Sequence, residues 1–188
     1  MMLSSKEKVY VVLFTCLQIR AVHLECTLSL SADNLFKAIS RFFSRRGIAS
    51  MFRSDNARTF KFTAERLASS HNLTWKFNTE RASWEGGSWE KLVKCVKGAL
   101  KSSISKVRHS YIDIETLICQ IEYIINCRPL TYANGNEEDI IPLSPNNFLI
   151  QPNTASRDPT KSTRNTIINT LACSKTALHQ FWHRWKTE

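Results

Sequence analysis

The sequence lacks any segment long and apolar enough to cross a membrane, and it has few residues that break regular structure. The apolar run Val9–Leu17 is much shorter than the roughly 20 residues that a bilayer-spanning helix needs. Only five glycines and five prolines occur in 188 residues, without repeats or low-complexity tracts. These absences exclude collagen-like chains, repeat arrays and flexible linkers. We expect a folded protein with no membrane partner.

The six cysteines include no Cys-x-x-Cys pair, and no histidine pair follows at zinc-finger spacing. They lie at positions 16, 26, 95, 119, 127 and 173. A chain of this length can bury enough apolar surface to fold without disulfide bonds. The cysteine pattern therefore favours reduced, buried thiols and an intracellular protein.

Acidic residues are few relative to basic ones. The chain has 26 Lys and Arg against 16 Asp and Glu, which gives a formal net charge of +10 and a pI near 9.5. Such a surplus favours an acidic partner, and nucleic acid is the commonest one. Because apolar residues make up 43% of the chain, as in globular proteins, we expect this charge on the surface of a folded domain.

The hydrophobic pattern predicts a mixed α/β fold. Segments 8–17 and 20–27 are rich in β-forming residues and are separated by a short join, which predicts an antiparallel hairpin with the first strand covered on both faces. Further strands are expected at 50–53 and 73–77, and helices at 31–47, 63–70, 88–108, 113–128 and 163–187. This order of elements is typical of an α/β layer fold.

Two acidic residues occupy positions where α/β proteins place functional groups. Asp55 follows the strand at 50–53, at the end of a strand where such folds expose their sites. Glu90 lies in the first turn of the helix at 88–108. Each position also has a structural explanation, because Asp-Asn dipeptides form Asx turns and the helix dipole favours an acid in the first turn.

A basic helix face gives Glu90 a functional context. Residues 91–109 contain no acid and six Lys or Arg. The spacing i, i+4, i+7, i+11 places four side chains on one exposed face, namely Glu90, Lys94, Lys97 and Lys101. One carboxylate followed by three aligned lysines is typical of a metal ligand beside a phosphate-binding surface. We call Lys94, Lys97 and Lys101 the lysine ridge.

These features, in this order, resemble the integrase catalytic core of retroelements, a ribonuclease-H-like fold of the DDE polynucleotidyl transferases. Within that superfamily the sequence is most similar to the BEL/Pao class of long-terminal-repeat retrotransposons. The resemblance covers almost the whole chain. Its motifs are LFTCL (13–17), RAVHLE (20–25), RRG (45–47), SDN (54–56), TERA (79–82), GGSWE (86–90), NCRPLTY (126–132), LSPNNFL (143–149) and FWHRW (181–185).

The resemblance implies a role for each candidate residue. Asp55 and Glu90, 35 positions apart, would be the second and third carboxylates of the catalytic, metal-binding triad. The lysine ridge would bind DNA, with Lys94 and Lys97 on the element's end. The implied cofactor is Mg²⁺ or Mn²⁺ in a two-metal site, and the implied activity is DNA integration by 3′-end processing and strand transfer. The implied partners are element-end DNA, target DNA and further copies of the chain, in the nucleus.

The family's first catalytic Asp lies on a central first strand, upstream of the strand at 8–17. Residues 1–7 contain no Asp, so we expect an N-terminally truncated core that lacks this strand and that forms the two-metal site only if the Asp is restored. Three interpretations therefore stay open: an integrase enzyme, a non-catalytic nucleic-acid-binding relic of one, and a nonfunctional remnant of the element whose product hardly accumulates. The expected organisation is a core at 1–130, a proline-containing loop or strap at 131–162 and a C-terminal helix at 163–188.

Overall fold

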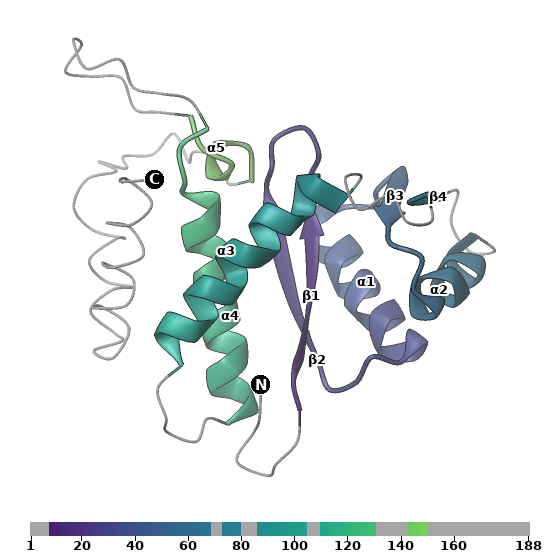
Figure 1. Ribbon diagram of the computed structural model, residues 1–188, viewed down its shortest axis with the longest axis horizontal. Helices are drawn as coiled ribbons and strands as arrows, with labels where there is room; N and C mark the ends of the chain where they lie inside the picture. Colours follow the sequence, from purple (N-terminus) through teal and green to yellow (C-terminus); the bar gives the residue numbers. More distant parts are fainter. Residues whose placement is uncertain (1–7, 69–72, 80–85, 105–109, 131–142, 150–188) are drawn as a thin grey trace.

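The computed structural model describes residues 8–68, 73–79, 86–104, 110–130 and 143–149 (Figure 1). Their elements are, in order, β1 (Tyr10–Thr15), β2 (Val22–Thr27), α1 (Ala32–Arg46), β3 (Met51–Ser54), α2 (Arg58–Ala68), β4 (Thr74–Phe77), α3 (Gly87–Ser103), α4 (Tyr111–Asn126) and α5 (Asn146–Leu149). All four expected strands are therefore present. The expected helix at 163–187 and most of the strap lie outside the described residues.

The first two strands form the expected antiparallel hairpin, with a register that runs from Tyr10 opposite Thr27 to Thr15 opposite Val22. Every residue of β2 is buried, whereas every residue of β1 is only half-buried. The side chains of β1 nevertheless pack on both faces, Val11 and Leu13 against one apolar cluster and Val12 and Phe14 against another, as the sequence predicts. β1 is only half-buried because β2 is the only strand among the described residues that pairs with it.

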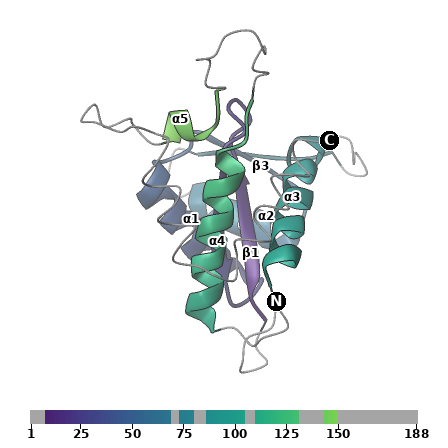
Figure 2. The same cartoon turned by 90° about the vertical axis from the view of Figure 1, so that its left-hand side faces the viewer.

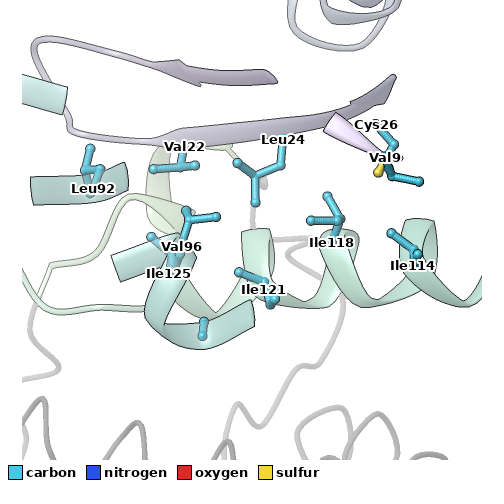
Figure 3. Close-up of a cluster of buried hydrophobic side chains, with 11 residues drawn as sticks. Val9, Val22, Leu24, Cys26, Leu92, Val96, Ile114, Ile118, Ile121 and Ile125 are labelled. Atoms are coloured by element: carbon cyan, nitrogen blue, oxygen red, sulfur yellow. The ribbon is translucent and has the colours of Figure 1, made fainter. Parts of the chain in front are cut away.

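Helices cover both faces of the hairpin. Figures 1 and 2 show α3 and α4 on one side and α1 and α2 on the other. On the α4 side, Val22 and Leu24 pack against a stripe of isoleucines, as Figure 3 shows. The stripe consists of Ile114, Ile118, Ile121 and Ile125, each 2% exposed or less. Its 3.6-residue period is the one the sequence predicts, and this cluster is the larger of the two apolar cores.

The second core is aromatic and lies on α1. Phe14 of β1 stacks on Phe42 of α1 with ring centroids 4.6 Å apart, and its centroid lies 6.1 Å from that of Phe52 of β3. Phe52 in turn meets Trp75 of β4 edge-on at 5.1 Å. This aromatic layer joins the hairpin to β3 and β4 through side chains alone.

The described strands form two separate two-stranded sheets. β1 and β2 are antiparallel, while β3 and β4 are parallel, with Met51 opposite Thr74. The mixture of directions agrees with the expected mixed sheet. No hydrogen-bonded ladder joins β1 to β3 in the part of the chain that the structure describes.

The sequence predicts three helix ends from single residues, with Ser31 opening α1, Gly47 ending it and Asp113 capping α4. Ser31 is the N-cap of α1 and Gly47 ends it with φ of 89°, both as expected. The expected cap of α4 at Asp113 is wrong. Ser110 is the N-cap, and Asp113 is the third helical residue, whose carboxylate accepts the Ser110 amide at 2.9 Å. This reciprocal capping box satisfies two backbone donors at once and starts the helix one turn earlier than a cap at Asp113 would.

The outer edge of β2 is closed by side chains instead of a third strand. Asn126 of α4 accepts the Val22 amide at 2.8 Å and donates to the Val22 carbonyl at 2.7 Å. Glu122, one turn earlier, accepts the Leu24 amide at 2.8 Å, and Arg41 of α1 donates to the Cys26 carbonyl at 3.0 Å. These contacts satisfy polar backbone groups that would otherwise be exposed for pairing with another chain.

The five described cysteines form no disulfide bond with one another. Cys26 is buried, and burial together with the charge of Glu115 raises the pKa of its thiol to about 11. Cys16 and Cys119, however, are exposed. The prediction that all cysteines are buried is therefore wrong for these two, and Cys173 lies outside the described residues.

None of the described helices is long and apolar enough to cross a membrane.

Candidate metal and nucleic-acid site

Asp55 lies directly after β3, at the edge where the parallel strands β3 and β4 both end. The residue is exposed, and its Oδ1 accepts the Ala57 amide at 3.0 Å. This is the Asx-turn contact that the Asp-Asn dipeptide predicts. Asp55 therefore has a structural role in this turn, and its carboxylate remains at the surface.

Glu90 is exposed in the first turn of α3. Its carboxylate folds back over the start of the helix, where a Cβ on Gly86 would lie 2.8 Å from Glu90 Oε1. Because Gly86 has no side chain and caps α3 without a side-chain hydrogen bond, the carboxylate lies near the positive end of the helix dipole. The lack of a Cβ at position 86 thus leaves room for an anionic group at this helix end.

The three lysines of the ridge are all exposed on α3, while Leu92, Val96 and Ala99 of the same helix are buried. The periodicity of the sequence correctly predicts which face is apolar. No acid among the described residues forms an ion pair with a lysine of the ridge. The exposed face of α3 therefore carries the acidic Glu90 in its first turn, followed by the three lysines of the ridge.

Asp55 and Glu90 are carboxylates, which are the oxygen donors that Mg²⁺ prefers. In the described part of the chain, however, no three His, Cys, Asp or Glu side chains come together so that they could hold a metal ion. The residues present have the right donor chemistry but do not by themselves form a complete site.

A second cluster of charges is buried between the hairpin, α1 and α4. The two ring nitrogens of His23 lie 3.0 Å from a Glu25 oxygen and 3.2 Å from Glu122. Arg41 donates to Glu25 at 2.6 Å and Arg46 to Glu122 at 2.6 Å, and Arg45 also pairs with Glu25. Because His23 and Glu25 alternate onto one face of the second strand, the sequence predicts that they make structural hydrogen bonds, and the structure contains them. Arginines balance both carboxylates here.

Glu122 was not singled out from the sequence, since an acid in a helix usually faces solvent. Burial by itself would raise the pKa of Glu122, but hydrogen bonds from His23 and the Leu24 amide, the attraction of His23 and a hydrogen bond from Arg46 lower it below its ordinary value of 4.5. The polar positions Glu122 and Asn126, spaced i, i+4 beside the isoleucine stripe, are the signal that could have revealed the role of this residue.

The lowered pKa predicts an acid-dependent loss of stability. A carboxyl group whose pKa falls on folding contributes stability above its unfolded pKa, and this contribution is lost as the pH falls through the folded pKa. We expect the free energy of unfolding to decrease below about pH 4.5, and the decrease to be shallower for Glu122→Gln, which cannot titrate. Urea unfolding between pH 7 and 3 measures both slopes, and equal slopes would contradict the prediction.

Two residues of the motif at 126–132 are also structural. Asn126 is 1% exposed and Arg128 is 7% exposed. Arg128 donates to the Ile125 carbonyl at 2.7 Å and to the carbonyl of Arg20. Arg20 lies in the hairpin turn with a positive φ of 54°. The motif thus joins the end of α4 to the hairpin.

Comparison with known proteins gives structural matches only, because no family model and no curated protein matches the sequence. One similar chain belongs to the cryoEM structure of the simian T-cell lymphotropic virus intasome in complex with PP2A regulatory subunit B56 gamma. Its TM-score is 0.61 at 9% identity, over 87% of this chain and 56% of that one. This chain therefore spans little more than half the length of that matched chain.

Two further matches are isolated integrase cores. The catalytic core domain of BIV integrase has a TM-score of 0.56 at 14% identity, over 76% of this chain and 86% of that one. The HTLV-2 integrase catalytic core domain, solved with magnesium in a trimeric form, has a TM-score of 0.52 at 14% identity, over 71% and 82%. The fold of this chain is therefore the ribonuclease-H-like fold of retroviral integrase catalytic cores.

Proposed function

We propose that the chain is a DNA integration domain, the catalytic core of a retrotransposon integrase of the BEL/Pao class. The observation that carries this proposal is the lysine ridge on an integrase-type fold, three exposed lysines in line with Glu90 on α3. Aligned lysines neutralise phosphates without reading base sequence. The substrate would be DNA, the place of action the nucleus, and the working form an oligomer of this chain.

Asp55 and Glu90 are the proposed ligands for Mg²⁺ or Mn²⁺. Asp55 ends β3 and Glu90 starts α3, and both carboxylates are exposed. The family resemblance assigns a third carboxylate to a strand that is not among the described elements. We propose that integration requires this third group, and that two carboxylates bind the metal only weakly.

A second candidate function is nucleic-acid binding without catalysis. It is favoured by the lack of a cluster of three possible metal ligands within the described ranges. The two functions share the lysine ridge, so they differ only in whether bound DNA is then cleaved and joined.

Neutralising the ridge tests the function that both candidates share. We expect Lys94→Gln, Lys97→Gln and Lys101→Gln together to weaken binding to a short DNA duplex roughly 10- to 100-fold at low salt, and to reduce the slope of log affinity against log salt by about 2 to 3. Fluorescence anisotropy over a salt series measures both quantities.

A matched control removes the same charge elsewhere. Lys37 of α1, Lys61 of α2 and Lys76 of β4 are also exposed, and their triple glutamine variant has the same net charge as the ridge variant. We expect it to retain most of the affinity. Equal losses in the two triple variants would show that total charge, and not the ridge, determines binding.

Paramagnetic Mn²⁺ tests the two carboxylates. We expect added Mn²⁺ to broaden the NMR signals of the Ala57 and Lys91 amides, next to Asp55 and Glu90, and Asp55→Asn with Glu90→Gln to abolish this effect. Broadening that persists in the double variant would place the metal elsewhere. In the same buffer, cleavage of an element-end oligonucleotide supports the enzyme, whereas DNA binding without cleavage supports the relic.

A further inference from the structure

We propose that Trp75 of β4 and Asn56 are positioning residues that hold the loop of Asp55 in one conformation and thereby orient its carboxylate. Neither residue is a proposed metal ligand, and the proposal rests on the proposed metal-binding function of Asp55. It is carried by side-chain hydrogen bonds that continue beyond the paired residues of β3 and β4.

The pairing of β3 with β4 ends just before Asp55. It runs as far as Ser54 opposite Phe77, and the Asn78 amide donates to the Ser54 carbonyl at 2.9 Å. Asp55 is the next residue, and it is exposed. The direction of its carboxylate therefore depends on what holds the residues on either side of it.

Trp75 holds the residue before Asp55. The indole N–H of Trp75 donates to Ser54 Oγ at 3.0 Å, and the same hydroxyl donates to the Asp55 carbonyl at 2.9 Å. Because an indole N–H can only donate, Ser54 Oγ is the acceptor in the first bond and keeps its own proton for the second. The Trp75 ring meets Phe52 edge-on at 5.1 Å, so the aromatic layer holds the donor in place.

Asn56 holds the residue after Asp55, because it is itself tied to the end of β4. Its side-chain amide donates to the Asn78 carbonyl at 2.5 Å. Asn78 Oδ1 accepts from Arg53 Nε at 3.1 Å. The loop is therefore bound to the end of β4 on both sides of Asp55.

These bonds leave the Asp55 carboxylate with one oxygen occupied. Oδ1 accepts the Ala57 amide at 3.0 Å, whereas no described residue donates a hydrogen bond to Oδ2. A carboxylate that is already oriented loses less conformational freedom when it binds a cation than a mobile one does. Residues that orient a metal ligand in this way raise its affinity for the metal.

Hydrogen exchange measures the loop in the absence of metal. Trp75→Phe keeps an aromatic ring but loses the N–H, and Asn56→Ala loses the amide. In both variants we expect the Ala57 amide to exchange roughly 5- to 10-fold faster than in wild-type protein. The Val22 amide, which binds Asn126, reports global opening. No acceleration at Ala57, or equal acceleration at Val22, would overturn the proposal.

Mn²⁺ titration measures the consequence for the metal, with broadening of the Ala57 amide NMR signal as the readout. We expect either variant to bind Mn²⁺ at Asp55 about 10-fold more weakly than wild-type protein. Unchanged affinity in the variants would overturn this proposal alone, because the bonds would then serve only the fold. No broadening in wild-type protein would overturn the metal-binding role of Asp55 itself, and this proposal with it.

A double-mutant cycle separates the Trp75 hydrogen bond from the packing of its ring. In a Ser54→Ala background we expect Trp75→Phe to cause no further loss of Mn²⁺ affinity, since the acceptor is already gone. A further loss as large as in wild-type protein would overturn the role of the hydrogen bond.

Asn34→Ala is the matched control for Asn56→Ala. It removes an amide that donates to Ser29 Oγ at 2.7 Å near the start of α1, and we expect wild-type Mn²⁺ affinity. A loss equal to that of Asn56→Ala would overturn the specific role of Asn56. Because Asn56 lies in a loop, its variant keeps the test valid even if Trp75→Phe does not fold.

Discussion

Replacing Asn126 by alanine is expected to lower the free energy of unfolding by about 2–6 kcal/mol, because it leaves two buried backbone groups without partners at about 1–3 kcal/mol each. Asn126 is 1% exposed and binds both the amide and the carbonyl of Val22. The substitution would leave the outer edge of β2 without its side-chain partner at Val22, the first residue of the strand. Urea denaturation followed by circular dichroism measures the loss.

Gln120→Ala is the matched control, since it removes an amide side chain from the same helix at a half-buried position without a hydrogen-bond partner among the described residues. We expect a change within about 0.5 kcal/mol. If both variants lost the same stability, a general sensitivity of α4 to the loss of a polar side chain, and not the closing of β2, would be responsible, because alanine favours the helix at both positions.

Replacing Ile121 by alanine is expected to cost about 2–5 kcal/mol, because it removes three carbon atoms from the centre of the larger core and leaves a cavity. Ile121 is fully buried between α4 and the hairpin (Figure 3). Differential scanning calorimetry and urea denaturation both measure this loss.

The same helix contains its own control, because Ile112 is 71% exposed. Ile112→Ala is the identical chemical change at the surface, and we expect it to alter stability by less than about 0.5 kcal/mol. A large loss for Ile112→Ala would mean that its side chain is covered by part of the chain beyond the described residues or by a second copy.

Local patterns predicted the elements of this fold well. Ser31 and Gly47 fix the two ends of α1 because each satisfies backbone groups of its own helix. The isoleucine stripe of α4 follows from its period alone. The start of α4 was predicted incorrectly, since Ser110 and Asp113 are both good N-cap residues and only their reciprocal hydrogen bonds show which one caps.

The candidate site was predicted in part. The lysine ridge is a property of one helix, so its exposure follows from periodicity. Whether Asp55 approaches Glu90 depends on how β3 is placed relative to α3, which spacing along the chain does not determine. The roles of Glu122 and Asn126 were missed for a similar reason, because only the position of α4 beside the edge of β2 makes their polar side chains necessary.

The closing of β2 by α4 also has a consequence for synthesis on the ribosome. The Val22 amide and its Asn126 partner are 104 residues apart. At about 5–20 residues per second, the hairpin waits roughly 5–20 s for that partner to be translated. During this interval the amides of Val22 and Leu24 lack their partners on α4. Long-range contacts of this kind slow folding, so we expect the nascent hairpin to benefit from a chaperone at this stage.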